Sequence, residues 1–184
     1  MLSPASPGQA VALDTSYVGR LTGVGAVWQL TAVDIATRPA VVRLVVGSKT
    51  AAVAAGFLDH LTKALRKHGI TWPGCCRTTA RSSPGGRSRP GSRTSGWLTT
   101  GSHPPRSPNH NAVRERLHGT LLREFFRPHF HRGRVDDIAL LERSLQAWIR
   151  DYTHHRPHQG DDMAGRTPLQ VKKEFRRRLR QTAA

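Results

Sequence analysis

RSPNHNAVRERLHGT, residues 106–120, is the stretch from which the fold of this chain is best predicted. Its first part contains Pro108, Asn109 and Asn111, residue types that favour turns and helix caps. An apolar side chain then recurs at every fourth position, at Val113, Leu117, Leu121 and Phe125. This spacing predicts an amphipathic helix with one packed face.

Glu115 stands near the start of the predicted helix. At about 100° per residue it lies about 200° from Val113, so it faces away from the packed side, together with Arg116 and Gly119. A carboxylate on that face can reach a cleft and bind a metal ion there. The alternative is a solvated glutamate among the charges of an exposed helix face.

The string SPNHNAVRER closely resembles the third catalytic motif of the integrase-core transposases, the D-D-E recombinases of bacterial insertion sequences and their retroviral integrase relatives. In that family a glutamate on such a helix is the last of three metal-binding carboxylates, so the resemblance implies that Glu115 is catalytic. The resemblance covers about residues 12–172. It implies an α/β fold, the RNase H-like integrase core, in which a mixed sheet is flanked by helices.

The expected organisation has three parts. Residues 1–9 form a disordered lead-in rich in Ser and Pro, residues 10–172 the catalytic core, and residues 173–184 the basic end of the last helix. In the resembling family, a helix-turn-helix region that recognises the ends of the element precedes the core. The lead-in is too short for such a region, so we expect an N-terminally truncated copy.

The charge of the chain points to a polyanionic partner. Its 184 residues include 29 Lys and Arg against 12 Asp and Glu, which gives a net charge of +17. Nucleic acid fits this balance best, although ribosomal and other RNA-binding proteins share it. The two cysteines, Cys75 and Cys76, are adjacent and provide neither a disulfide framework nor a CxxC zinc site. Because no signal peptide or long apolar run is present, we expect a cytoplasmic protein.

VALDTSYV, residues 11–18, is the first predicted strand. Alternation places Val11 and Leu13 on one face and Asp14 on the other. An aspartate in a strand is most simply an edge or turn residue. In the resembling family, however, the aspartate of this strand is the first catalytic carboxylate, and Asp14 matches it.

Two further strands are predicted at residues 27–34 and 40–46, in an antiparallel meander with the first. Asp34 ends the second of these strands. In the resembling family the residue at this place is not a metal ligand. We therefore predict that Asp34, with Thr37 and Arg38, shapes the turn between the strands.

Residues 50–68 form the clearest predicted helix. Its apolar stripe consists of Val53, Phe57, Leu61 and Leu65. Ser48 or Thr50 can cap its start, and Gly69 suits the position after its end. In an RNase H-like fold such a helix leads to a fourth strand that carries the second catalytic aspartate. The sequence after the helix contains no stretch that predicts this strand.

Residues 75–103 do not fit the pattern of a compact domain. They contain no Asp or Glu and few apolar residues, a composition typical of a disordered basic linker. Codons compatible with residues 74–84, read one base earlier, can encode VLSDDGPEFT, which resembles the family's second motif, TDNGPEF. We hypothesise a one-base deletion near Gly74 and a compensating insertion near His103. These two changes would disrupt the fourth strand and remove the second aspartate, which would be encoded across the codons of Arg77 and Thr78.

A basic aromatic connector is predicted at residues 125–134, before a second long helix. The connector holds His129 and His131, which are candidate metal ligands. With no Cys or third His at zinc spacing, we predict surface histidines instead. Asp136 is the predicted cap of the helix that follows. The apolar stripe of that helix consists of Ile138, Leu141, Leu145, Trp148 and Tyr152.

The C-terminal part carries two further motifs. YTHHRPHQG, residues 152–160, resembles the YNxxRPHxG segment of the family, whose Arg and His anchor the C-terminal part of the core. Thr167 and Gln170 make a capping box with Pro168 at the first helical position. The last helix has an apolar side at Val171, Phe175 and Leu179. Its basic remainder can follow the phosphates of DNA or can simply be solvated.

The resemblance assigns Asp14 and Glu115 as catalytic residues and metal ligands. In an intact family member three carboxylates hold two divalent cations, Mg²⁺ or Mn²⁺, which serve the cutting and joining of DNA strands. This chain has an arginine or a threonine where the second aspartate belongs. We therefore expect a degenerate, inactive copy.

The expected partner is DNA, both the ends of the element and its target, with a second copy or an intact transposase as a further partner. Residues expected to contact DNA lie in two groups. The first is Arg106, Asn109, His110, Asn111 and Arg116, and the second is Lys172, Lys173, Arg176 and Arg177. The alternative function is that of a non-catalytic basic protein that binds nucleic acid. A metal-dependent nicking assay separates the two.

Overall fold

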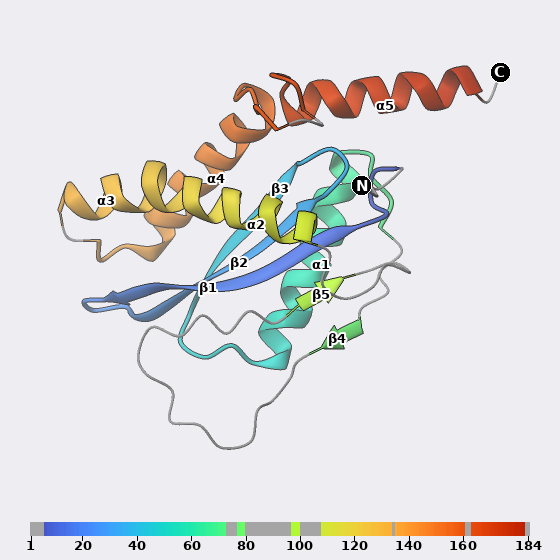
Figure 1. Cartoon of the computed structure of the whole chain (residues 1–184). Helices are drawn as coiled ribbons and strands as arrows, with labels where there is room; N and C mark the ends of the chain where they lie inside the picture. Colours follow the sequence, from blue (N-terminus) through green and yellow to red (C-terminus); the bar gives the residue numbers. More distant parts are fainter. Residues whose placement is uncertain are drawn as a thin grey trace.

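A five-stranded sheet lies at the centre of the fold (Figure 1). The computed structural model describes residues 6–72, 77–79, 97–99, 108–133, 135–160 and 163–182. Within these residues the strand order is β3-β2-β1-β5-β4. The long strands β1 (Val11–Leu21), β2 (Gly25–Asp34) and β3 (Ala40–Val46) form the predicted antiparallel meander. β1 and β2 are longer than predicted, because their pairing continues to Leu21 and Gly25.

Alternation along β1 divides its side chains between two layers. Val11 and Leu13 are buried with residues of α1 (Ala51–Lys67), as predicted. The opposite face of the sheet is covered by α2 (Pro108–Leu121) and α4 (Ile138–His154). Figure 1 shows α1 on one side of the sheet and these two helices on the other. Asp14 therefore points to the layer that contains α2.

Two short strands, β4 (Arg77–Thr79) and β5 (Trp97–Thr99), extend the sheet beyond β1. Thr99 pairs with Ala12 on one side and with Arg77 on the other. Every pairing among the described residues is antiparallel, so the expected mixed sheet is not found there. β4 does not pair directly with β1, because β5 lies between them. Strands of three residues are too short for apolar alternation to predict them. The predicted disorder of residues 75–103 otherwise lies outside the described residues.

α1 follows its sequence pattern closely. Of the two predicted caps the structure uses Thr50, whose hydroxyl accepts a hydrogen bond from the Val53 amide at 3.3 Å. Phe57, Leu61 and Leu65 are buried on its inner face. The helix ends before Gly69, whose φ of +64° lies in the left-handed region that favours glycine.

The helix that begins at Pro108 continues further than predicted. After α2 it widens into η1 (Leu122–Phe126), a π-helical turn, and resumes as α3 (Arg127–His131). The predicted connector is therefore largely helical. In the widened turn the Arg127 amide donates a hydrogen bond to the Leu122 carbonyl. The next residue, Pro128, has no amide hydrogen to donate. The π turn also shifts the helical register, so that both Phe125 and Phe126 are buried.

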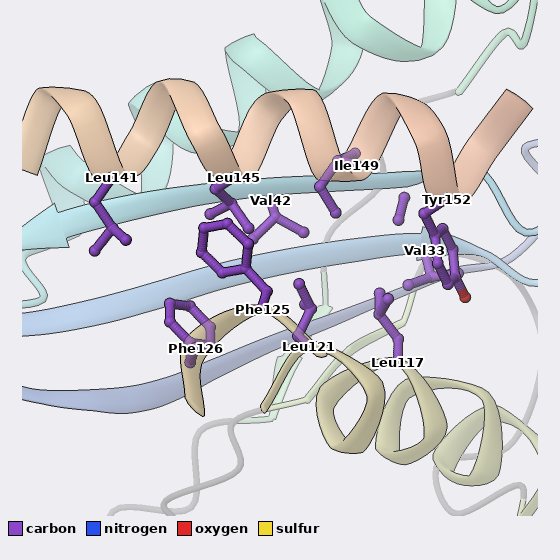
Figure 2. Close-up of a cluster of buried hydrophobic side chains, with 11 residues drawn as sticks. Val33, Val42, Leu117, Leu121, Phe125, Phe126, Leu141, Leu145, Ile149 and Tyr152 are labelled. Atoms are coloured by element: carbon purple, nitrogen blue, oxygen red, sulfur yellow. The ribbon is translucent and has the colours of Figure 1, made fainter. Parts of the chain in front are cut away.

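α4 packs across the sheet on the same side as α2. Asp137, not the predicted Asp136, caps it, because the Asp137 carboxylate accepts hydrogen bonds from the amides of Ala139 and Leu140 at 2.8 and 3.0 Å. Figure 2 shows the cluster that joins α4 to the sheet and to the helix that carries η1. The buried members of this cluster include Val33, Val42, Leu117, Leu121, Phe125, Leu141, Leu145 and Ile149.

Polar side chains of α4 also protect the edge strand β3. The Leu44 amide donates to Glu142 Oε2 at 2.8 Å, and Gln146 Nε2 donates to the Val42 carbonyl at 2.7 Å. Arg43 Nε lies 2.9 Å from Glu142 Oε1. These contacts occupy backbone groups that an edge strand would otherwise offer to another chain.

The last helix, α5 (Pro168–Thr182), opens with the predicted capping box. The Thr167 amide donates to Gln170 Oε1 at 2.8 Å, and the Gln170 amide donates to Thr167 Oγ1 at 3.2 Å. Val171 is buried at its start, whereas Leu179 is exposed near its end. None of the described helices has the length and apolarity needed to cross a membrane.

Candidate functional site

Asp14 lies in the middle of the sheet, on the face that α2 covers. Its side chain is 9% exposed, and its Oδ1 accepts a hydrogen bond from the Thr15 amide at 2.8 Å. β1 is held on both sides, by β2 and by β5. The alternative of an edge or turn residue therefore does not describe Asp14, and a carboxylate buried in the sheet needs a partner to offset its desolvation.

Arg114 of α2 is that partner. Its Nε lies 3.3 Å from Asp14 Oδ2, and its side chain is only 7% exposed. On a helix Arg114 lies about 100° from Val113, beside the apolar stripe and not opposite to it. The sequence analysis of the helix missed this residue, because a basic side chain next to a buried stripe is usually assigned to solvent.

His118, one turn after Arg114, also lies close to Asp14. Its Nδ1 lies 3.5 Å from Asp14 Oδ2, and its Nε2 lies 3.3 Å from Thr31 Oγ1. Thr31 stands directly opposite Asp14 on β2 and accepts a hydrogen bond from Gln29 Nε2 at 2.6 Å. The spacing of Arg114 and His118 at i and i+4 was the signal available in the sequence, since such residues share one helix face.

Glu115 lies next to this network but is 67% exposed. Arg114 Nη2 is 3.9 Å from Glu115 Oε1, so one guanidinium links Asp14 and Glu115. The structure thus brings both predicted carboxylates to the same arginine. Their role as metal ligands stays a prediction.

A comparison with family models covers the α2 part of this site. Residues 99–168 match the model described as integrase core domain. Over these residues the chain is similar to an integrase core domain. No curated protein and no solved structure matches the chain. The match includes Arg114, Glu115 and His118, whereas Asp14 lies outside the matched residues.

Integrase cores of the resembling family bind divalent metal ions, but the residues described here do not fit a metal pair. Among them, no three His, Cys, Asp or Glu side chains gather closely enough to hold a metal ion. Asp14 Oδ2, the oxygen that a cation would approach, faces Arg114 and His118. A positively charged guanidinium at that oxygen repels a divalent cation.

Asp34, the other aspartate of the meander, has a structural role. The Asp34 carboxylate is buried and accepts hydrogen bonds from Gly8 N, Thr37 N and Thr37 Oγ1 at 2.8, 2.8 and 2.6 Å. The Arg38 amide donates to the Asp34 carbonyl at 2.9 Å. The predicted turn role of Asp34 is therefore confirmed. Burial raises the pKa of Asp34, and the hydrogen bonds from Thr37 and Gly8 act against that rise.

The two histidines of the predicted connector, His129 and His131, lie on α3. His129 Nδ1 is 2.8 Å from the Phe125 carbonyl, and its ring centroid is 4.1 Å from that of Phe125. His131 is exposed at the end of α3. The surface position predicted for His131 is confirmed, whereas His129 is half-buried against Phe125.

The RPHQG turn after α4 makes contacts with η1 and with the end of α4. Arg156 forms a two-pronged ion pair with Glu124 of η1, in which Nη2 lies 2.6 Å from Oε1. His158 packs edge-on against Tyr152 with centroids 4.5 Å apart. Burial raises the pKa of Tyr152 to about 12. The turn thus ties the end of α4 to the helix that carries the candidate site.

The residues predicted to bind DNA differ in whether the structure describes their side chains. Arg106 and the side chains of Asn109, His110 and Asn111 lie outside the described residues. Arg116 is exposed and reaches the turn after α4, where a Cβ on Gly160 would lie 3.1 Å from Arg116 Nη1. The two groups predicted from the sequence are therefore not equally testable in this structure.

The structure corrects the prediction that Lys172 of α5 is exposed on the basic face. Its side chain is 9% exposed, and burial lowers its pKa, with Arg176 and Lys173 adding to the decrease. The sequence placed it on the basic face, but Lys172 follows Val171 in the first turn of α5, where the helix meets the core. Lys173, Arg176 and Arg177, by contrast, are exposed and line a shallow open groove with Arg180. Arg176 also covers Gly69, at the C-terminal end of α1, where a cation is favoured.

Proposed function

We propose that this chain is a degenerate copy of a transposase catalytic core of the D-D-E type, with an RNase H-like fold, and that it binds DNA without cutting it. The observation that carries the proposal is the integrase core match over residues 99–168, together with the position of α2 against Asp14 of β1. Arg114 lies near both Asp14 and Glu115, the carboxylates that the resemblance assigns to the first and third family motifs. Nothing in the composition alone would select this site.

The loss of catalysis follows from charge. A metal pair in an intact family member needs three carboxylates, and here Arg77 and Thr78 stand where the second is expected. β4, which contains them, lies two strands from β1 with Arg77 level with Ala12 through Thr99. Asp14 and Glu115 are left with Arg114, whose single charge and hydrogen-bond geometry do not replace Mg²⁺ or Mn²⁺.

The frame hypothesis accounts for this loss. The family match begins at residue 99, close to His103, where we propose that the original frame returns. Residues 11–46 form a regular meander and α1 has a well-formed apolar stripe, which fits an intact frame before Gly74. The arginines between these limits would then have no selected function.

DNA binding rests on the exposed cations of α5 and on the net charge of +17. Contacts with phosphate carry no sequence information, so little sequence preference is expected. Binding of labelled duplex DNA at rising salt tests the proposal. A steep loss of affinity with salt and equal binding of unrelated sequences support it, and salt-independent or absent binding contradicts it.

The second candidate function is that of a non-catalytic partner that interferes with intact transposase, either as a mixed oligomer or by covering DNA. The contacts of Asp14 favour it, because the site is closed by Arg114 while the core around it is well packed. Addition of the chain to an active transposase reaction distinguishes a mixed oligomer from simple covering of the DNA. Inhibition that excess DNA does not relieve indicates a mixed oligomer.

A further inference from the structure

A second polar site lies at the β3 edge of the sheet, two strands from Asp14 of β1. It is a cavity of about 120 Å³ beside the edge strand β3, between α1 and α4. α1 contributes His60 and His68, and α4 contributes Arg150, Thr153 and His154. The family resemblance assigns no role to these side chains.

We call this cavity the histidine pocket. Its charged and titratable lining side chains are all basic. It holds three imidazoles and one guanidinium, and no carboxylate is among its lining residues. The rings of His68 and His154 lie 6.5 Å apart, centroid to centroid, so they flank the space without touching. The volume exceeds the ~10–15 Å³ that one water needs, and a tetrahedral oxyanion fits as well.

Thr153 supplies an independent observation. Its side chain is 3% exposed and lines the pocket, and its Oγ1 has no hydrogen-bond partner within the described residues. A buried hydroxyl without a partner is unfavourable, so this group is suited to a ligand that accepts a hydrogen bond. An anion is such a ligand.

The surrounding charges favour the same class of ligand. Burial lowers the pKa of His60, and Arg43, Lys67 and Lys63 lower it further. Burial likewise lowers the pKa of His68, with additional effects of Lys172 and His154. Burial is the larger cause of both shifts, and the neighbouring cations add positive charge around the pocket. Glu142 accepts a hydrogen bond from Gln146, which lines the pocket, and pairs with Arg43.

We propose that the histidine pocket binds a phosphate group, held by Arg150, His68, His154 and the Thr153 hydroxyl. A metal site is the other use of three histidines, but His60, His68 and His154 do not gather as metal ligands in the described part of the chain. The inference does not depend on the proposed function, since it uses none of the residues around Asp14. The phosphate comes either from the DNA backbone or from a small anion in solution.

Titration of the whole chain with sodium phosphate near pH 6, at constant ionic strength with chloride, tests the proposal. Imidazole ¹H–¹³C resonances of His68 and His154 should shift and saturate. Their pKa values should rise, because a bound anion favours the imidazolium. Arg150→Gln should weaken the apparent affinity by about tenfold or more, the loss of one charge-assisted hydrogen bond.

Matched variants make the test specific. Arg143→Gln removes an exposed arginine of α4 that does not line the pocket, and it should bind phosphate as the unaltered chain does. Thr153→Val keeps the shape of the side chain without its hydroxyl, and it should also weaken binding. If duplex DNA affinity falls with Arg150→Gln but not with Arg143→Gln, the source is the DNA backbone. If only inorganic phosphate is affected, the ligand is a small anion. Absence of saturable shifts, or an equal loss in Arg143→Gln, would overturn the proposal.

Discussion

Arg114 Nε lies 3.3 Å from Asp14 Oδ2, and both side chains are more than nine-tenths buried. This buried ion pair joins α2 to the central strand of the sheet. Removal of one partner from such a pair leaves an uncompensated charge, which is far more costly than loss of a surface pair. The pair therefore bears on stability as well as on function.

Arg114→Met should destabilise the fold by about 3 kcal/mol, because the buried Asp14 carboxylate would lose the guanidinium that offsets its charge. The double variant Asp14→Asn, Arg114→Met should recover part of the loss. Denaturant unfolding of the four combinations measures the coupling. Arg123→Met, an exposed arginine on the same long helix, is the control. A loss in Arg114→Met no larger than in this control would show that the pair does not stabilise the fold.

Lys172 and Lys173 are neighbours with opposite exposure, and their variants should separate stability from DNA binding. Lys173→Met should weaken DNA binding and lower the dependence on salt by about one unit of slope. Lys172→Met should leave affinity unchanged, because the Lys172 side chain is 9% exposed. Fluorescence anisotropy at several salt concentrations measures both. Equal losses for the two variants would mean that Lys172 reaches the DNA despite its burial.

His68 should make the fold sensitive to mild acid. Burial, Lys172 and His154 lower its pKa in the folded state below 6.5. The unfolded chain therefore binds more protons, so stability is full above about pH 6.5 and falls as the pH drops from there toward the folded pKa. His68→Gln should flatten this decrease in thermal unfolding scans. His155→Gln, on an exposed side chain, should not. A decrease of equal size in both variants would exclude His68 as the source.

Most of the fold could be predicted from residue spacing. The meander, the buried stripe of α1, the Thr50 cap and the capping box at Thr167 depend on local patterns, and local patterns are visible in sequence. The missed features depend on tertiary contacts. Arg114 is buried because Asp14 lies across from it, and Lys172 because α5 begins against the core.

The remaining differences are of two kinds. Asp136 and Asp137 are both sound caps, and only the path of the chain into α4 decides between them. The π turn at Leu122–Phe126 arises from the need to bury two adjacent phenylalanines before a proline, which no simple helical period predicts. For the candidate site, sequence predicted both carboxylates but not the arginine between them.

The frame hypothesis makes a prediction about the coding DNA. Read one base earlier from the Gly74 codon, it should encode an uninterrupted segment that contains Asp, then Asp or Asn, then Gly-Pro-Glu-Phe. Sequencing of the DNA that encodes residues 70–108 decides this. A stop codon in that frame, or a peptide without the aspartate, would contradict the hypothesis.

The most direct test of the central claim is nicking of supercoiled plasmid DNA with Mg²⁺ or Mn²⁺. Four proteins are compared: the chain as it stands, the same chain with its frame repaired between residues 74 and 103, and the repaired chain with Asp14→Ala or Glu115→Ala. The unaltered chain should not nick. The repaired chain should regain metal-dependent nicking, and each alanine variant should lose it. Nicking by the unaltered chain that persists in its own Glu115→Ala variant would contradict the claim that Asp14 and Glu115 are the surviving carboxylates of a metal site.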